Sequence, residues 1–278
     1  MQAELQQWYR RLCSQELRYW LYKQRHPREF RQLRTRCDSN GEVAFSLSGF
    51  AQRKAIFVHI TKSAGTSVGL GLFGMLPSHY TAWQYRVIFG RSAFNRYFKF
   101  TFVRNPWDRL YSAFSYLKGG GWHSDDARWA DEHLQGIDDF NQFVTEWLNP
   151  ERLNSHIHFW PQSRFIVDGK GRVLVDYLGY FETLDRDFPN IAARVNPQAQ
   201  LVRTNSSRRG SYLDVYTPAA SARVAQLYAE DIRRFGYRFD GFTRRCVVNG
   251  VLVNSAESEA VSEIVAPIPD LAGPQFDV

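Results

Sequence analysis

The chain has 278 residues, a formal net charge of +7 at pH 7 and 15% aromatic residues. This length allows one large α/β domain with extensions and a sizeable core. The three cysteines, Cys13, Cys37 and Cys246, are widely spaced, which indicates neither a disulfide framework nor a cysteine zinc site and favours a reducing compartment. No apolar run approaches the roughly 20 residues that a membrane-spanning helix needs, and the N-terminus does not have the pattern of a signal peptide.

Positive charge is concentrated in residues 1–54, which carry a net charge of +6. Residues 1–36 predict a helix with an apolar stripe among arginines, and His26-Pro27 is expected to break it. We favour a helix that packs this stripe on the main domain; the alternative is an amphipathic segment that contacts an anionic membrane surface or an acidic glycan. The stripe consists of Leu5, Tyr9, Cys13, Leu17, Trp20 and Leu21.

The next segment, from Ala55 to Ser67, predicts a buried strand that turns into a helix. Residues 55–60 are apolar except for His59, which is typical of a parallel strand. Gly65 is expected to give the backbone freedom for a tight turn, and Thr66 or Ser67 to cap a helix over residues 68–76.

This strand-to-helix turn also has the residues of an anion site. Free amides at a helix start, beside the ammonium of Lys62, attract phosphate or sulfate. The turn is not a Walker A loop, because Lys62 precedes Gly65 instead of following a glycine. An ordinary turn with a solvated lysine remains the alternative for this segment alone.

A second strand-to-helix junction follows further along the chain. Residues 97–103 predict a strand, Asn105 is a good N-cap, and Pro106 suits the first helical position. Gly119 is expected to end the helix after Lys118. Both junctions should therefore lie at the carboxyl edge of one parallel sheet, where such sheets bind ligands.

Arg104 and Ser112 make this junction a second candidate anion site. Arg104 lies at the end of the predicted strand, and Ser112 is two helical turns beyond Asn105 on the same helix face. Taken alone, Arg104 also suits a carboxylate partner, and Ser112 also suits a buried small residue.

Together the two junctions resemble the carbohydrate branch of the sulfotransferases, which includes heparan sulfate 2-O-sulfotransferase and bacterial family 2 relatives. In that family the first loop, Lys-Thr-Ala-Gly-Thr-Ser, holds the 5′-phosphosulfate of 3′-phosphoadenosine 5′-phosphosulfate (PAPS), and a Val-Arg-Asn-Pro segment holds its 3′-phosphate. Here Thr61 stands where the family usually has proline and Ser63 where it has threonine, whereas residues 102–112 match throughout. The resemblance extends over about residues 55–239.

The resemblance implies the site residues. His79 is the only histidine between the two motifs and would be the general base, with a surface loop histidine as the alternative. Lys62 would stabilise the leaving phosphate. The expected PAPS-binding residues are Lys62, Ser63, Ala64, Gly65, Thr66, Ser67, Arg104, Ser112, Arg208 and Arg209. No metal is expected, because His156 and His158 have no third ligand pattern in the sequence.

We therefore expect an α/β fold with a single P-loop-like domain, a parallel sheet flanked by helices, and a helical N-terminal extension. The expected domains are a basic extension (1–54), a sulfotransferase domain (55–242) and an acidic, poorly ordered tail (243–278). The expected location is the bacterial-type cytoplasm, or the Golgi lumen if an N-terminal anchor has been trimmed.

The expected reaction is in-line transfer of a sulfuryl group from PAPS to a hydroxyl of a carbohydrate or glycolipid acceptor. One alternative is a nucleotide-dependent, kinase-like phosphotransferase, against which the loop order and the lack of an evident magnesium carboxylate argue. Another is a basic, non-catalytic adaptor that binds nucleic acid or anionic lipid. The near-neutral charge of residues 55–278 argues against an adaptor, so no nucleic acid partner is expected.

Overall fold

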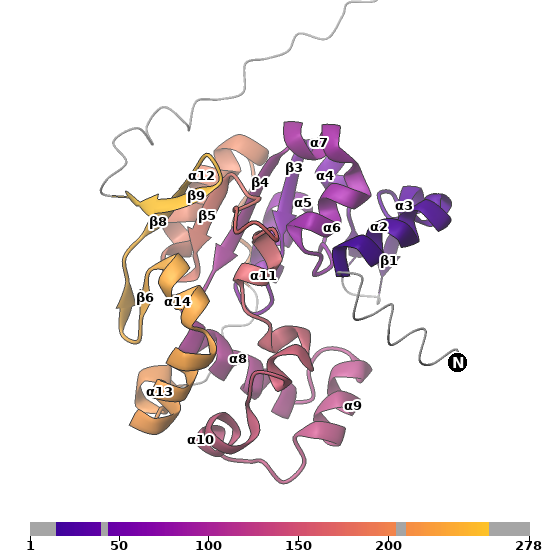
Figure 1. The fold of residues 1–278 in the computed structure, drawn as a ribbon. Coiled ribbons are helices and arrows are strands. Elements are labelled where there is room, and N and C mark those ends of the chain that lie inside the picture. Colours follow the sequence, from indigo (N-terminus) through magenta and orange to yellow (C-terminus); the bar gives the residue numbers. More distant parts are fainter. Residues whose placement is uncertain (1–14, 40–43, 204–209, 256–278) are drawn as a thin grey trace, which may run out of the picture.

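The computed structural model describes residues 15–39, 44–203 and 210–255 (Figure 1). Its helices are α2 (Gln15–Arg25), α3 (Pro27–Gln32), α4 (Ser48–Arg53), α5 (Gly65–Phe73), α6 (Ala82–Phe89), α7 (Arg91–Arg96), α8 (Pro106–Lys118), α9 (Ser124–His133), α10 (Phe140–Gln142), α11 (Ser163–Ile166), α12 (Leu184–Val195), α13 (Pro218–Leu227) and α14 (Ala229–Phe235). Its strands are β1 (Cys37–Ser39), β2 (Ala44–Ser46), β3 (Ala55–Val58), β4 (Phe98–Val103), β5 (Tyr177–Tyr180), β6 (Tyr237–Arg238), β7 (Gly241–Phe242), β8 (Arg245–Val248) and β9 (Val251–Asn254). The shorter helical turns are η1 (Phe143–Trp147), η2 (Arg152–Asn154), η3 (Ile157–Phe159), η4 (Phe181–Thr183) and η5 (Tyr212–Asp214).

The centre of the fold is a parallel three-stranded sheet with the order β3-β4-β5, which confirms the α/β prediction. Every residue of β3 and β4 is buried, as expected for strands covered on both faces. Phe57 pairs in register with Phe100, and their rings stack with centroids 5.1 Å apart. Helices flank this sheet, and α8, α9 and α10 lie below it in the view of Figure 1.

Helix α8 begins and ends where the sequence predicts. The side-chain oxygen of Asn105 accepts a hydrogen bond from the Trp107 amide at 3.1 Å, and Pro106 occupies the first helical position. The helix ends at Lys118, with Gly119 as its C-cap. Because α8 follows β4 directly, its N-terminus lies at the carboxyl edge of the sheet.

Helix α5 differs from its prediction at both ends. It runs from Gly65 to Phe73, and its N-cap is Ala64, with no side-chain cap. The prediction that Thr66 or Ser67 caps this helix is therefore wrong. Both hydroxyl residues lie inside its first turn, because the turn before the helix is closed by left-handed backbone and not by a side chain.

The N-terminal helices confirm one prediction and correct another. α2 ends at Arg25 and α3 begins at Pro27, so His26-Pro27 does break the helix. The prediction that Leu17 and Trp20 belong to the packed stripe is wrong, since they are 43% and 46% exposed. Tyr19 contacts the core instead, with its ring centroid 5.2 Å from that of Phe30. Leu5, Tyr9 and Cys13 lie outside the described residues.

Two cations of this segment bind the end of α6. Lys23 donates to the carbonyl of Val87, and the Nε of Arg34 donates to the carbonyl of Ile88 at 2.8 Å. The last carbonyls of a helix have no partners within the helix and carry its negative dipole end, so both contacts are favourable. Part of the basic character of residues 1–54 is therefore used to hold α2 and α3 on the main domain.

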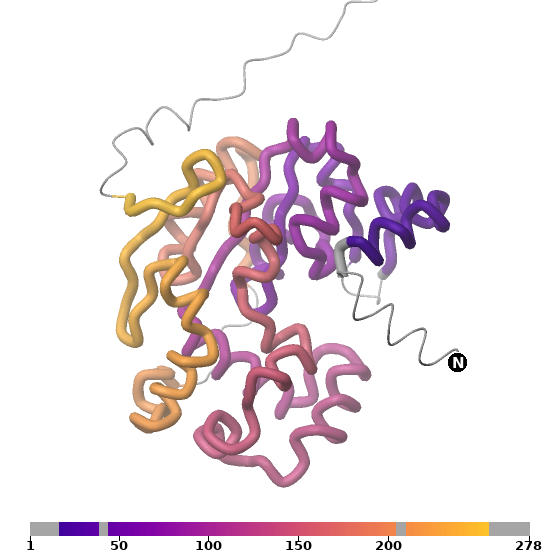
Figure 2. Tube along the Cα trace, in the orientation of Figure 1, coloured from indigo at the N-terminus to yellow at the C-terminus, as the bar shows by residue number. Residues whose placement is uncertain are grey.

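The expected acidic tail begins with an ordered hairpin, which the sequence analysis did not predict. β8 and β9 pair antiparallel, with Arg245 opposite Asn254, and Figure 2 shows this yellow hairpin beside the α12 and β5 side of the sheet. Residues 256–278 lie outside the described structure. Within residues 15–39, 44–203 and 210–255, no helix has the length and apolarity to cross a bilayer.

Candidate functional site

The loop between β3 and α5 has an unusual backbone conformation. Lys62 and Ala64 adopt φ angles of 62° and 61°, in the left-handed region that non-glycine residues rarely occupy. Such alternation of backbone makes successive amides converge, and the first turn of α5 adds further amides and its positive dipole end. The geometry of this loop therefore suits a phosphate or sulfate group.

Gly65 serves this loop by its lack of a side chain. It does not adopt a positive φ, so the expectation that it gives backbone freedom is wrong. A Cβ at Gly65 would lie 1.7 Å from Nε2 of His59, a distance that no rearrangement short of moving the imidazole would relieve. His59 is buried, and its Nδ1 lies 3.1 Å from the carbonyl of Pro77.

Arg104 brings the second junction into contact with the first. Its Nη1 donates to the carbonyl of Lys62 at 2.9 Å, so both junctions lie at the same edge of the sheet. The Nε and Nη2 of Arg104 both contact Asp108 Oδ2 at 2.7 Å, and its guanidinium lies 3.9 Å from the Phe181 ring centroid. Arg104 is 7% exposed, so much of its bonding capacity holds the loops together.

Arg109 anchors the first loop through its guanidinium, a role that the sequence analysis did not assign to it. Its Nε donates to the carbonyl of Thr61 at 2.9 Å, and its Nη2 lies 3.0 Å from the Thr61 hydroxyl. Its Nη1 donates to the carbonyl of Trp160 at 2.9 Å. The guanidinium is 1% exposed, so these bonds are made where water does not compete.

Gln162 joins the same two loops from a third segment. Its amide group donates to the carbonyl of Arg104 at 2.8 Å and accepts from the amide of Arg104 at 2.9 Å. The hydroxyl of Ser63 lies 3.5 Å from the same side-chain oxygen. Asp231 in turn accepts from the backbone amides of Gln162 and Ser163. These contacts join segments that are distant in the sequence, namely the two loops, residues 162–163 and Asp231.

The ammonium group of Lys62 lies over an aromatic ring that is itself held in place. Nζ of Lys62 is 3.9 Å from the Tyr116 ring centroid, within the range of a cation–π contact. The Tyr116 hydroxyl donates to Asp126 Oδ2 at 2.6 Å and accepts from the Trp122 amide at 2.7 Å. The position of Lys62 thus depends on the α8–α9 connection as well as on its own loop.

The side chain of His79 makes a hydrogen bond through Nδ1, and this bond fixes its tautomer. Its Nδ1 lies 2.9 Å from the carbonyl of His59, and because a carbonyl only accepts, Nδ1 carries the proton. Burial lowers the pKa of His79, and the charges of Arg109 and Lys62 act in the same direction. The neutral imidazole therefore presents the lone pair of Nε2, which is the state that a general base requires.

The remaining predicted site residues divide by location. Ser112 lies on α8 and is 9% exposed, and Thr66 and Ser67 lie in the first turn of α5. Arg208 and Arg209 lie outside the described residues. The sequence analysis assigned no role to four residues of the site, because each acts through contacts with other segments that no local sequence pattern predicts. They are Arg109, Gln162, Tyr116 and Asp126.

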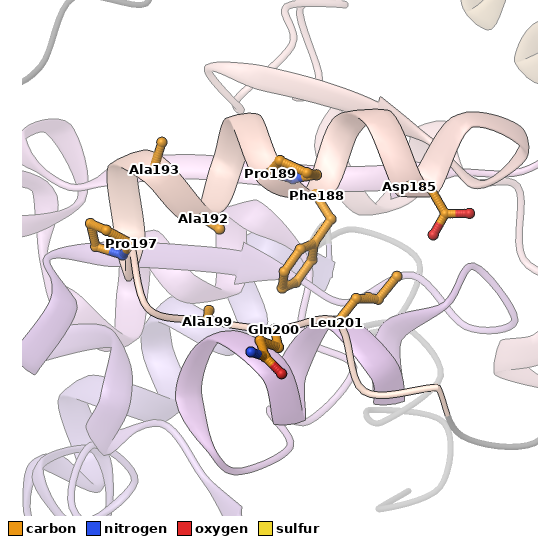
Figure 3. A pocket seen from close by; sticks show the side chains of 9 residues that line it. All are labelled: Asp185, Phe188, Pro189, Ala192, Ala193, Pro197, Ala199, Gln200 and Leu201. Carbon is orange, nitrogen blue, oxygen red and sulfur yellow. The ribbon is translucent and has the colours of Figure 1, made fainter.

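A separate cavity of about 400 Å³ lies along α12 (Figure 3). Phe188 and Leu201 line it, as do Pro189 and Pro197, and none of the predicted site residues that the structure describes does. Its walls are mainly apolar and present one carboxylate, that of Asp185. Among the described residues that line it there is no cation, and none of them belongs to the two loops, so it is not the site that those loops form.

Comparison with known proteins identifies the class. Residues 79–238, more than half of the chain, match the model of the sulfotransferase family, so the chain belongs to the sulfotransferase family. The matched residues include His79 and the whole second junction, whereas the first loop precedes them. This finding confirms the family resemblance of the sequence.

One curated relative is similar over part of the chain. It is an uncharacterized protein of Archaeoglobus fulgidus, 27% identical over 133 residues, which are 47% of this chain and 95% of that protein. No solved structure matches this chain.

Proposed function

We propose that this protein transfers a sulfuryl group from PAPS to a hydroxyl of a carbohydrate or glycolipid acceptor. The observation that carries the proposal is the contact between Arg104 and the carbonyl of Lys62 at 2.9 Å. That contact joins two anion-type junctions at one sheet edge, which suits a donor with a phosphosulfate at one end and a 3′-phosphate at the other.

In the proposed complex the first loop receives the 5′-phosphosulfate. Amides of residues 63–67 would donate to its oxygens, and Lys62 would stabilise the charge that develops on the phosphate as the S–O bond breaks. Ser112 and Arg104 would contact the 3′-phosphate, and Arg208 and Arg209 are proposed as further ligands of the same group. Because the guanidinium of Arg104 already binds Asp108, we expect Arg104 to contribute as much by holding the loops as by binding the donor.

The acceptor hydroxyl would lose its proton to Nε2 of His79. The hydrogen bond from Nδ1 to the carbonyl of His59 supports this role, because it fixes the tautomer and the ring orientation. The SO₃ unit then passes in line from the phosphate oxygen to the acceptor oxygen, and the product 3′-phosphoadenosine 5′-phosphate leaves with the negative charge. No metal is required for this step as written; positioning and charge stabilisation supply its catalysis.

An aromatic surface beside the loop favours a sugar as the acceptor. Trp122 is 43% exposed, its ring stacks on that of His123, and its amide binds the same Tyr116 hydroxyl that supports Lys62. Exposed aromatic rings next to a reacting centre stack well on the apolar faces of sugar rings. This surface would be the same in a Golgi enzyme whose anchor has been trimmed and in a bacterial cytoplasmic enzyme, so it does not distinguish these two expected locations.

Titration calorimetry on the full chain tests the donor assignment. We expect 3′-phosphoadenosine 5′-phosphate (PAP) to bind with one-to-one stoichiometry, and adenosine 5′-phosphate and ATP to bind much more weakly because they lack the 3′-phosphate. Tight binding of ATP in preference to PAP would indicate the phosphotransferase alternative. Preferential binding of single-stranded DNA would indicate the adaptor.

A further inference from the structure

Two histidines and an aspartate form a cluster that the proposed transfer does not use. Asp126, His156 and His158 each place one candidate ligand atom within 4.8 Å of the other two. Asp126 lies in the first turn of α9, and the histidines lie at the start of η3 and within it. The fold therefore supplies the third ligand that the sequence pattern of His156 and His158 lacked.

The spacing inside the cluster suits coordination. His156 Nε2 is 3.3 Å from Asp126 Oδ1, which is the separation of two ligands on a tetrahedral ion with bonds of about 2.0 Å. The two side chains are 12% and 14% exposed, so their positions are set by packing. The backbone also closes on them, because a Cβ at Gly121 would lie 2.4 Å from the Cβ of Asp126.

His158 provides an independent observation that points to a missing partner. It is 7% exposed, and its Nδ1 is buried with no hydrogen-bond partner. A buried polar atom of this kind destabilises the fold unless a partner satisfies it. An imidazole that is buried beside another imidazole and a carboxylate, and that has such a nitrogen, is a group that a metal ion would engage.

The surroundings of the cluster resemble the outer contacts of metal sites. The hydroxyl of Tyr116 donates to Asp126 Oδ2 at 2.6 Å, which leaves Oδ1 to face His156.

We propose that Asp126, His156 and His158 bind one divalent transition-metal ion of the zinc type, with a fourth position open to water. The ion takes Asp126 Oδ1 and Nε2 of His156. Without the ion, Nδ1 of His156 accepts a hydrogen bond from the His158 amide at 3.3 Å. Coordination through Nε2 moves the imidazole proton to Nδ1, so this hydrogen bond is lost. This bond is at the long end of the normal range, so its loss is a small opposing cost.

Such an ion would connect α9 to η3 and hold the Tyr116 ring under Lys62. It would then act on the transfer site through Tyr116, by positioning and not by contact with the donor. The metal site itself depends only on the three ligands and their contacts, so it stands apart from the proposed transfer reaction.

The test is titration of the untagged full chain with Co²⁺ and then with Zn²⁺. We expect one Co²⁺ per chain, with the intense visible absorption of a tetrahedral site, and displacement by Zn²⁺. Asp126→Asn and His158→Ala should weaken Zn²⁺ binding about 100-fold or more, and Tyr116→Phe by about 10-fold, as for an outer contact. His133→Ala and Cys37→Ser, which change an exposed histidine and an exposed thiol, should leave binding unchanged.

Two results would overturn the site. One is a wild-type chain that gives no tetrahedral Co²⁺ spectrum; the other is binding that Cys37→Ser abolishes while Asp126→Asn does not. Thermal melting of the wild-type chain keeps the test decisive if a ligand variant fails to fold. Excess Zn²⁺ should raise its melting temperature relative to a chelator, by linkage to the folded state, and an unchanged melting temperature would also contradict the proposal.

Discussion

The two strand-to-helix junctions have similar sequences of small, polar and basic residues, yet they use them differently. In the first junction the backbone forms the site: Lys62 and Ala64 are left-handed, and the helix begins without a side-chain cap. In the second the side chains form the scaffold: Asn105 caps α8, and Arg104 and Arg109 bind carbonyls of the first loop. The first junction is thus shaped by the second.

The difference shows that a basic residue in an anion motif need not be an anion ligand. Arg109 is nearly fully buried and bonds only to protein oxygens in the contacts described above, whereas the half-buried Lys62 extends its ammonium over a ring. We therefore expect changes in the first junction to reduce catalysis and donor binding, and a change at Arg109 in the second to reduce stability. Four substitutions test this division.

The largest effect is expected for His79, whose Nδ1 bonds to the carbonyl of His59 just before the first junction. His79→Asn keeps a donor for the carbonyl of His59 but removes the basic nitrogen, so turnover should fall by about two to four orders of magnitude. PAP affinity, measured by calorimetry, should stay nearly constant because a base acts on the acceptor. His133→Asn is the control, since Nδ1 of His133 also lies 2.9 Å from a carbonyl but the side chain is exposed. Near-normal turnover of His79→Asn would assign the base to another residue.

The next effect is expected for the ammonium of Lys62. Lys62→Gly is the informative change, because glycine tolerates the φ of 62° and removes the charge without straining the loop. Turnover should fall by about 10²–10³-fold, and PAP binding should weaken as well. Ala64→Gly changes a residue of the same loop with the same left-handed backbone, and should leave both quantities close to wild type. Equal losses in the two variants would mean that loop shape, not charge, is what matters.

A loss of stability is expected in the second junction. Arg109→Met removes the donors to the carbonyls of buried Thr61 and half-buried Trp160, which should cost about 3 kcal/mol in the free energy of unfolding. Urea denaturation measures this cost. Arg96→Met, at an exposed position of α7, should change the free energy by less than about 0.5 kcal/mol. A stable Arg109→Met chain that no longer binds PAP would contradict the division of roles.

The sequence was sufficient for the parts of this fold that local chemistry decides. The bounds of α8, the strands β3 and β4 and the break at His26-Pro27 follow from Asn, Pro, Gly and apolar runs acting over a few residues. The α/β class follows from their order. These features need no knowledge of what packs against them.

The missed features depend on contacts between distant segments. The need for glycine at position 65 comes from the imidazole of His59, and the left-handed turn before it is held by Arg109 and Gln162 from other elements. Asp126 meets His156 only because α9 folds back on η3. In α2, helical periodicity identified an amphipathic segment, but the site of docking on the main domain selected Tyr19 over Leu17.

The smallest expected effect concerns Ser112 of the second junction, which we assign to the 3′-phosphate of the donor together with Arg104. Ser112→Ala removes a single hydroxyl from α8, so it should weaken PAP binding by about 10-fold, the low end of the value of one hydrogen bond to a charged group, and change stability little. Ser115→Ala is matched to it, on the same helix, but the Ser115 hydroxyl donates to the carbonyl of Tyr111 at 2.8 Å and should not affect PAP. Adenosine 5′-phosphosulfate, which lacks the 3′-phosphate, should bind equally well to wild type and Ser112→Ala. If Ser112→Ala weakens both nucleotides alike, or neither, the 3′-phosphate does not lie against this face of α8, and Ser112 has no part in donor binding.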